Sequence, residues 1–334
     1  MTIHEIYSRT TRRFLQPVAH LLDDPSVSEV LINGPTMIFA ERAGRLTLEE
    51  GLDFEDETAL LAAARNIAEF AGRPLHSGVH SVDARLPDGS RVHVILPPCS
   101  RVGVCLSIRK YNTAKLRLNQ LVELKTLNQP MADFLIQAVA GHQNLVVSGG
   151  TGSGKTSLLN ALSAEIDPAE RIVVIEDSSE LQLQQLHTLY LEAQPADRSG
   201  LGAVTIRDLF VDSLRMRPDR ILVGEVRRGE ALDLIQSMVS GHRGAMTTVH
   251  ASTPRDAAVR LETLSLMGGV SIPAHVARVQ VASAIDIIVQ ISRTADGSRR
   301  ITEITRCRGL SETAGPTPDY DLEVLFRQKS SDIL

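Results

Sequence analysis

The chain has 334 residues, 43% of them hydrophobic, and its 35 basic and 40 acidic side chains give a formal net charge of −5. This length favours two globular domains. Because the net charge is negative, we expect neither bulk attraction to an anionic membrane nor stable binding of nucleic acid. There is no apolar run of the roughly 18 residues that span a bilayer, no secretory signal and no paired cysteine motif, so we expect a cytoplasmic protein without a disulfide framework or zinc site.

Residues 1–22 place apolar side chains at helical spacing and arginines on the other side, which predicts one amphipathic helix. This helix either packs on its own domain or docks on a membrane surface or a partner. A second helix is predicted over residues 57–72, ended by Gly72 and Pro74. Short strands are predicted at 28–34, 37–42, 43–49, 81–87, 91–97 and 103–110. These elements predict a compact α+β domain over residues 1–110.

Residues 111–118 are polar and basic, and we interpret them as an interdomain linker whose cations are solvated, with nucleic-acid contact as the alternative. From residue 119 to 334 the pattern changes to apolar strands that alternate with helices. Helices are expected at 129–142, 156–166, 205–217 and 229–241, and strands at 144–150, 171–177, 219–225, 244–250 and 320–326. Near-continuous apolar strands between helices predict a parallel sheet covered on both faces, and so a second domain of α/β class.

The strongest chemical signal is "GGTGSGKT", which follows an apolar strand and opens a helix. Amide groups and the helix dipole at such a position favour phosphate oxygens, so the pattern predicts a site for ATP and Mg²⁺, with Lys155 neutralising the β and γ charges and Thr156 holding the metal. A glycine-rich turn without a ligand is the structural alternative. The predicted cofactor contacts are Gly149, Gly150, Thr151, Gly152, Ser153, Gly154, Lys155, Thr156 and Ser157.

Acidic residues end two of the predicted strands: Glu176 and Asp177 close one, and Glu225 closes the other. In a parallel sheet both ends reach the edge where the phosphate loop opens. We expect Glu176 to position the attacking water and Glu225 to complete the Mg²⁺ shell through water. Capping of the following helices is the structural alternative for both residues.

Two histidines, His242 and His250, flank the segment "GHRGAMTTVH". A metal pair is disfavoured because the spacing is not helical i, i+4 and no third ligand is near. Nucleophilic catalysis is unnecessary, since phosphoryl transfer to water depends on positioning and charge stabilisation. Structural packing and nucleotide sensing remain open for both histidines.

These residues carry a family resemblance. The segments "GGTGSGKT", "RIVVIEDSSELQL", "RPDRILVGEVRRGEALD", "GHRGAMTTVHASTPRDAAVRLE" and "VASAIDIIVQISRTADGSRRITEI" resemble the successive boxes of the type II/type IV secretion ATPases, most closely the CpaF/TadA branch of tight-adherence and Flp pilus motors. The resemblance implies an α/β, RecA-like P-loop ATPase domain with a smaller amino-terminal α+β (PAS-like) domain. It also implies a homohexamer that docks on an inner-membrane platform protein, and hydrolysis of ATP to drive pilus assembly or secretion.

The resemblance assigns further roles. It implies that His250 lies near the γ-phosphate and couples nucleotide state to conformation, and that His242 and Arg227 match recurrent positions near the nucleotide. Arg91 and Arg109 match arginines that close the ATP site from the amino-terminal domain, where guanidinium groups stabilise the transferring phosphoryl. Arg85 is a weaker candidate, with solvent-facing strand placement as its alternative.

The chain also departs from the family pattern. The long helical extension of many CpaF-type members is expected to be absent or reduced to one helix, Gln194 stands where relatives usually have Arg, and the tetracysteine element of other branches is missing. A conjugative or type IV secretion ATPase is the first alternative function. A DNA-translocating motor and a nucleotide-binding scaffold without turnover are further alternatives from other classes.

Overall fold

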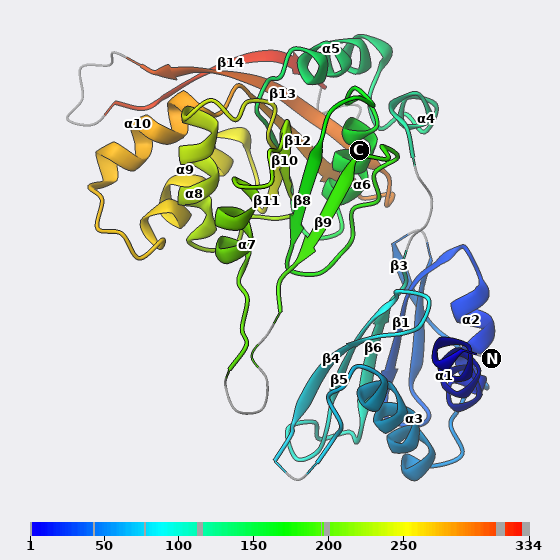
Figure 1. The fold of residues 1–334 in the computed structure, drawn as a ribbon. Helices are drawn as coiled ribbons and strands as arrows, with labels where there is room; N and C mark the ends of the chain where they lie inside the picture. Colours follow the sequence, from blue (N-terminus) through cyan, green and yellow to red (C-terminus); the bar gives the residue numbers. More distant parts are fainter. Residues whose placement is uncertain are drawn as a thin grey trace. The chain divides into compact units, whose positions relative to one another are not determined.

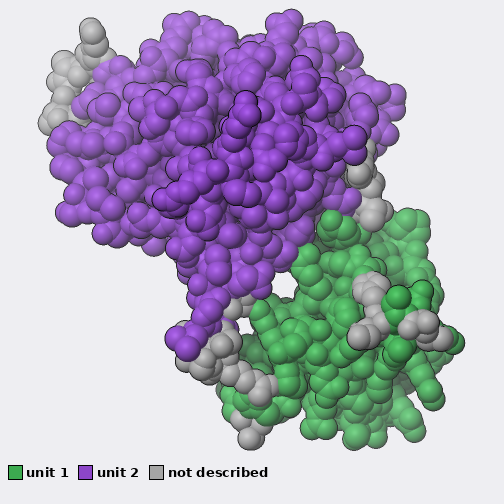
Figure 2. Space-filling view, in the orientation of Figure 1, with its two compact units in different colours: residues 1–113 green, residues 114–334 purple. Residues whose placement is uncertain are grey.

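A computed structural model describes the chain except for residues 1, 43, 77, 112–115, 195, 197–200, 312–317 and 329–334. The chain splits into two compact units, residues 1–113 and 114–334 (Figure 2). Of the linker expected at 111–118, residues 112–115 lie outside the described residues. Its last residue, Leu118, is buried and begins the first helix of the second unit, so the linker is shorter than predicted at that end.

The first unit is a six-stranded antiparallel sheet, in the order β3-β2-β1-β6-β5-β4, with its helices on one face (Figure 1). Burial alternates along the central strands, as a sheet covered on one face requires. Its strands are β1 (Val27–Asn33), β2 (Ile38–Arg42), β3 (Arg45–Leu48), β4 (Ser81–Arg85), β5 (Arg91–Ile95) and β6 (Cys105–Arg109), and α3 (Glu57–Phe70) crosses the covered face. The predicted elements of this domain are confirmed apart from the first helix.

The single helix expected over residues 1–22 is broken in two. Helix α1 (Ile3–Phe14) ends at Leu15, a 3₁₀ turn covers Gln16–Val18, and α2 (Ala19–Asp23) follows. Pro17 explains the break, because proline has no amide proton and its ring clashes with the carbonyl four residues earlier. Helix α1 packs on α3, where Tyr7 and Phe70 bring their ring centroids to 4.1 Å, so the structure supports packing on its own domain.

The second unit is built on an eight-stranded sheet in the order β14-β13-β12-β7-β11-β10-β8-β9. The strands from β12 to β9 are parallel, but β13 and β14 are antiparallel, so the sheet is mixed and the prediction of a parallel sheet was incomplete. Its strands are β7 (Leu145–Ser148), β8 (Ile172–Glu176), β9 (Thr188–Glu192), β10 (Arg220–Val223), β11 (Met246–Val249), β12 (Ile287–Arg293), β13 (Arg299–Leu310) and β14 (Tyr320–Arg327).

Helices cover both faces of this sheet (Figure 1). They are α4 (Leu118–Glu123), α5 (Gln129–Ala140) and α6 (Lys155–Ser163) on one face, and α7 (Ile206–Ser213), α8 (Glu230–Val239), α9 (Pro254–Leu266) and α10 (Ala274–Ala284) on the other. Successive residues of one strand enter opposite cores: in β8, Ile172 and Val174 meet the first face, and Val173 and Ile175 meet the second. This is why the strands read as continuous apolar runs. Within the described residues no helix is long and apolar enough to cross a bilayer.

Parallel pairing aligns the carboxyl ends of the central strands. Ser148 at the end of β7 lies opposite Val249 at the end of β11, and Val223 of β10 lies opposite Ile175 of β8. The residues that follow these ends therefore meet along one edge of the sheet. We call it the carboxyl edge, and the opposite one, where the same strands begin, the amino edge.

Candidate functional site

The phosphate loop lies between β7 and α6, the strand–loop–helix context that the sequence predicted. Gly154 caps α6 with φ of 98°, a left-handed conformation that favours glycine. A Cβ on Gly149 would lie 2.3 Å from the carbonyl oxygen of Ile291 in β12, so only glycine fits there. The loop is thus held tightly from the β12 side.

The inner side of the loop suits a chain of phosphates. Lys155 is 8% exposed, and its ammonium donates to the carbonyl of Gly150 at 2.9 Å, which places the cation over the loop. A Cβ at Gly150 would meet nothing within 4 Å, so there is space beside this cation. The first-turn amides of α6 have no carbonyl ahead of them within the helix, and the helix dipole favours an anion at that end. These features fit a nucleoside triphosphate.

The metal side of the site involves a residue that the sequence reasoning missed. The hydroxyl of Thr156 donates to Glu180 Oε2 at 3.0 Å, so a carboxylate stands beside the hydroxyl that would hold Mg²⁺. Glu176, which we expected to position the water, is 4% exposed, and its Oε1 accepts the amides of Glu180 and Leu181 at 2.9 and 3.0 Å. In the structure Glu176 therefore fixes the loop that presents Glu180.

Glu225 lies at the centre of a charged network at the carboxyl edge. Its Oε1 is 2.9 Å from His250 Nε2, and its Oε2 accepts from Nε of Arg227 at 2.8 Å. Arg227 also donates to Asp177 at 2.7 Å, and His250 Nε2 lies 3.4 Å from the ammonium of Lys155. The imidazole of His250 thus contacts both Lys155 and Glu225, so three of the predicted site residues lie together.

The environment of His250 disfavours the protonated form of its ring. Partial burial lowers its pKa, and the positive charge of Lys155 lowers it further, which together outweigh the opposing effect of the Glu225 carboxylate. A neutral ring has one donor and one acceptor nitrogen, and Nε2 of His250 faces both the Glu225 carboxylate at 2.9 Å and the Lys155 ammonium at 3.4 Å. His250 is therefore set to respond to charge placed beside Lys155.

A model of the type II/IV secretion system protein family matches residues 12–316. The chain belongs to this family. It is 36% identical over 328 residues to the type IV secretion system protein PtlH of Bordetella pertussis, with 89% of this chain and 95% of that protein covered. It is 33% identical over 331 residues to the type IV secretion system protein VirB11 of Bartonella quintana, with 87% and 91% covered.

Solved structures agree on the fold. The ATPase DotB of Legionella pneumophila has a TM-score of 0.62 and 21% identity, with 87% of this chain and 78% of that chain covered. The pilus retraction motor PilT with bound ADP has a TM-score of 0.56 and 16% identity, with 99% and 84% covered. The likeness confirms the α/β fold of RecA-like type preceded by a smaller amino-terminal domain.

The family resemblance also pointed to arginines of the first unit, and these form a row. Arg85, Arg91 and Arg109 lie directly opposite one another across β4, β5 and β6. Residues in such positions share one face of a sheet, and Glu29 of β1 lies opposite Arg109 in the same row, so the row combines three arginines with a carboxylate. Because all three belong to the first unit, their role as arginine fingers stays a prediction.

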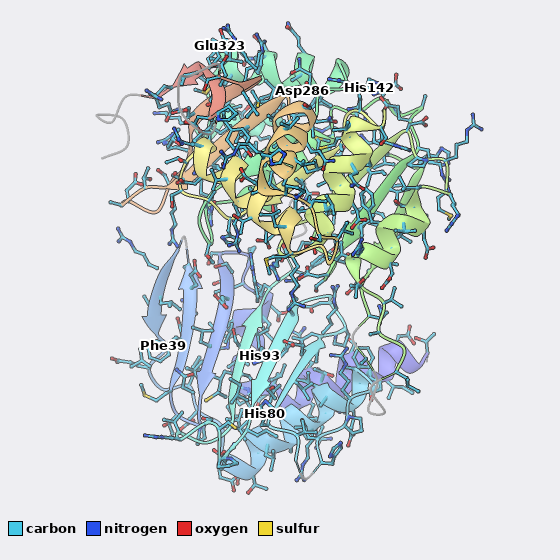
Figure 3. All side chains as sticks on the ribbon, turned by 90° about the vertical axis from the view of Figure 1, so that its left-hand side faces the viewer. Phe39, His80, His93, His142, Asp286 and Glu323 are labelled. Atoms are coloured by element: carbon cyan, nitrogen blue, oxygen red, sulfur yellow. The ribbon has the colours of Figure 1, made fainter. Side chains whose placement is uncertain are left out.

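His242 does not join the other predicted residues within the second unit. It lies between α8 and β11, at the amino edge, where its backbone amide donates to Ser237. The next residue, Arg243, pairs at 2.8 Å with Asp286, which precedes β12 (Asp286 is labelled in Figure 3). Strand β11 separates His242 from His250, so we do not retain His242 as a contact of the phosphate loop in the same unit. Gln194, the departure from the family, forms an isolated bridge with Val204.

The turn between β12 and β13 adds arginines that the sequence reasoning did not assign to the site. Arg293 and Arg299 lie opposite each other at the end of the two strands. Nε of Arg299 donates to the carbonyl of Gly152 at 3.4 Å, and a Cβ on Gly152 would lie 3.8 Å from Nη1 of Arg293. The segment "DGSRR" is a hairpin signal, which places Arg293 and Arg299 at the end of a two-stranded turn. Because β12 pairs with β7, that turn lies beside the phosphate loop.

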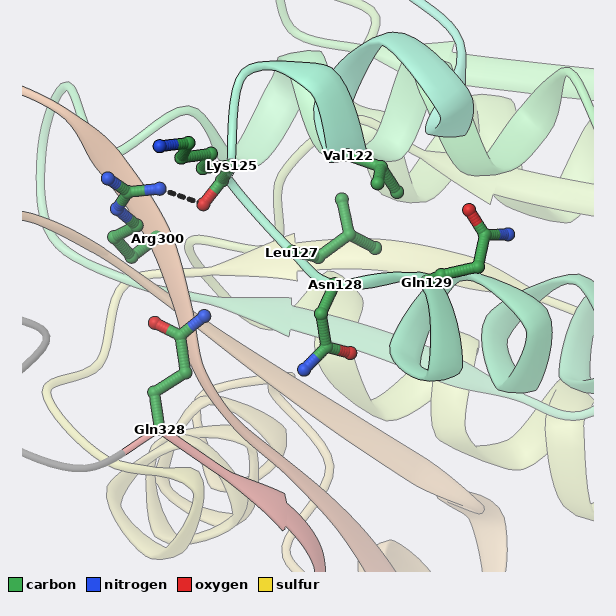
Figure 4. Close-up of a pocket in the computed structure, with 7 residues that line it drawn as sticks. All are labelled: Val122, Lys125, Leu127, Asn128, Gln129, Arg300 and Gln328. Atoms are coloured by element: carbon green, nitrogen blue, oxygen red, sulfur yellow. Dashed lines mark hydrogen bonds between the residues drawn. The ribbon is translucent and has the colours of Figure 1, made fainter.

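A cavity in the second unit lies away from the phosphate loop. It has a volume of about 430 Å³ and is lined by residues of the α4–α5 connection together with Arg300 and Gln328 (Figure 4). Arg300 closes one side by donating to the carbonyl of Lys125. No residue of the phosphate loop lines it, so it is not part of the candidate site.

Proposed function

We propose that this chain is a Mg²⁺-dependent ATPase, a motor that hydrolyses ATP to drive a type II/IV secretion or pilus machine. The observation that carries the proposal is the convergence of Lys155, Glu225 and His250 beside the phosphate loop. Family membership supports it, because solved proteins of the same fold are titled ATPases or motors.

Each residue of the site has a distinct proposed role in ATP hydrolysis. Lys155 and the first turn of α6 neutralise the phosphates. Because Glu176 accepts the amides of Glu180 and Leu181, we assign the attacking water and its proton to Glu225 instead, in place of the Mg²⁺-shell role expected from the sequence. Bound Mg²⁺ would be held by Thr156 with Glu180 beside it and would supply charge stabilisation for the transferring phosphoryl. His250 and Arg227 contact both oxygens of Glu225, so turnover requires at least one of these contacts to loosen.

The working assembly is proposed to be a cytoplasmic homohexamer, peripheral at the inner membrane and docked on a platform protein. Arg91 and Arg109 would close the nucleotide site and stabilise the transferring phosphoryl. Closing and reopening around ATP would convert hydrolysis into rigid-body motion of the two units.

Two machines remain candidates. The segments "LRMRPD" and "DGSRR" favour the tight-adherence or Flp pilus branch. The names of the relatives, which include VirB11, PtlH and the conjugal transfer protein TrbB of Rhizobium radiobacter at 33% identity, favour a conjugative or type IV secretion motor. Both share the ATP chemistry proposed above.

The first test is ATP hydrolysis by the purified chain, with its mass followed by light scattering and with or without DNA. We expect a hexamer whose turnover is insensitive to DNA and falls on the order of 100-fold in Glu225→Gln. Glu323→Gln, whose carboxylate pairs with Arg308 on β13, is the matched control and should keep full turnover. Strong stimulation by DNA would favour a translocase, and nucleotide binding without turnover would favour a scaffold.

A further inference from the structure

A buried glutamine lies between the two key loops of the site. Gln290 is 3% exposed on β12, and in the parallel register it lies opposite Ser148, the last residue of β7. Ser148 directly precedes Gly149, the first glycine of the phosphate loop. Gln290 is therefore next to the point where the strand becomes the loop.

All the polar groups of the Gln290 side chain have partners. Its Oε1 accepts the hydroxyl of Ser148, and its Nε2 donates to the carbonyls of Ala251 and Ser252 at 3.3 and 3.2 Å. A buried amide with every donor and acceptor engaged holds the connected segments in one arrangement. One side chain thus ties the start of the phosphate loop to the segment that follows His250.

The contacts around Gln290 allow a movement of the phosphate loop to reach the segment that follows His250. β12 contacts the phosphate loop closely at Gly149, and its pairing with β13 shifts register between Gln290 and Ile291. On the other side, Ala251 and Ser252 separate His250 from Thr253, whose hydroxyl caps α9. Movement of the 251–252 carbonyls would therefore shift the imidazole relative to Lys155 and Glu225.

We propose that Gln290 is a positioning residue that couples the phosphate loop to His250. Occupation of the loop by phosphates displaces Ser148, the Gln290 amide transmits the displacement to residues 251 and 252, and the His250 ring changes its contact with Glu225. This inference rests on the proposed ATPase function and names a regulatory connection within the same site.

The chain contains a matched control. Gln185 is also buried, at 9% exposure, and its Nε2 also donates to two carbonyls, those of Ser163 and Ile166 at 2.7 and 3.0 Å. The first carbonyl belongs to the last residue of α6 and the second lies three residues beyond it, at the end of the helix far from the phosphate loop. Gln185→Glu thus imposes a similar loss of two buried donors without touching the loops.

The experiment uses the full chain and two measurements. Hydrogen exchange is followed in peptides covering 148–157 and 249–256, with and without Mg²⁺ and a non-hydrolysable ATP analogue, and kcat and KM for ATP are measured in parallel. In the wild type the analogue should slow exchange in both peptides. In Gln290→Glu, where a carboxylate faces two carbonyls, only the 148–157 peptide should respond, and kcat should fall about tenfold with little change in KM.

Gln185→Glu should keep both responses and the wild-type kcat, even if its melting temperature falls as far as that of Gln290→Glu. Gln290→Met, which removes the same donors without adding a charge, repeats the test if Gln290→Glu does not fold. Retention of the analogue response at 249–256 in both Gln290 variants would overturn the coupling, as would equal losses of kcat in the Gln290 and Gln185 variants. A wild type without any response at 148–157 would instead refute nucleotide binding, and the coupling with it.

Discussion

The two edges of the eight-stranded sheet hold their charges differently. At the amino edge two arginines each bind one carboxylate: Arg220, 1% exposed, donates through Nε and Nη2 to both oxygens of Glu170, and Arg243 pairs with Asp286. His142 approaches Glu170 only at 3.6 Å. At the carboxyl edge partners are shared, because Glu225 divides its two oxygens between His250 and Arg227. Ion pairs with a single partner are suited to stabilising the fold. A carboxylate shared by two partners can exchange one contact for another.

This difference has an energetic basis. A buried pair with one geometry is costly to break, because removal of one member leaves the other charge desolvated. In a network where each group has two partners, loss of one contact is partly offset by the other. We therefore expect changes at the amino edge to alter stability and changes at the carboxyl edge to alter turnover.

The amino edge should show the largest effect on folding. Arg220→Met removes the partner of Glu170 and should lower the free energy of unfolding by about 3–5 kcal/mol, measured by urea denaturation. Arg243→Met, at the same edge but with its side chain 54% exposed, is the control and should cost less than about 1 kcal/mol. The folded Arg220→Met protein should keep the wild-type KM for ATP, and equal losses in the two variants would contradict the distinction.

At the carboxyl edge, substitutions of Glu180 and Glu176 should differ in how far they change the Mg²⁺ requirement for turnover. Glu180→Gln weakens the carboxylate beside Thr156, so the Mg²⁺ concentration for half-maximal turnover should rise about tenfold. Glu176→Gln keeps an oxygen that can accept the amides of Glu180 and Leu181, so it should shift this concentration less. Titration of turnover with Mg²⁺ distinguishes the two, and a larger shift for Glu176→Gln would show that Glu176, and not Glu180, sets the affinity for the metal.

Much of this site could be predicted because its signals are local. The phosphate loop needs only a strand, a glycine pattern and a helix, and the convergence of Glu225 and His250 follows from strands that run in parallel. The break at Pro17 is also a local signal, but the prediction of one helix over residues 1–22 rested on apolar periodicity alone and did not use it.

The remainder depends on contacts between distant segments. The bonds from Thr156 to Glu180 and from Ser148 to Gln290 join residues 24 and 142 positions apart, and neither pair forms a sequence motif. The antiparallel direction of β13 follows from the turn at Gly297, but its place in the sheet depends on β12 pairing with β7. Such pairings are set by packing that no single segment determines.

A smaller effect should come from the β12–β13 turn. Arg299→Ala removes the donor to the Gly152 carbonyl and should raise the Kd for an ATP analogue about threefold, since the bond is long and the side chain exposed. Arg308→Ala, on the same strand but paired with Glu323, should leave the Kd unchanged. Isothermal titration calorimetry measures both, and equal affinities for the wild type and Arg299→Ala would show that the turn does not support the loop.

The smallest effect is a pH dependence at His250. Its pKa is lowered in the folded state, so at acidic pH the unfolded chain binds the proton more readily and protonation favours unfolding. Between about pH 7.5 and about pH 5.5, which bracket the ordinary histidine pKa of about 6.5, the wild type should lose more stability than His250→Gln. Because the charge of Lys155 is one cause of the shift, the difference between Lys155→Ala and Lys155→Ala with His250→Gln should be smaller. Parallel pH profiles for the wild type and His250→Gln would show that the shared network does not hold the ring neutral.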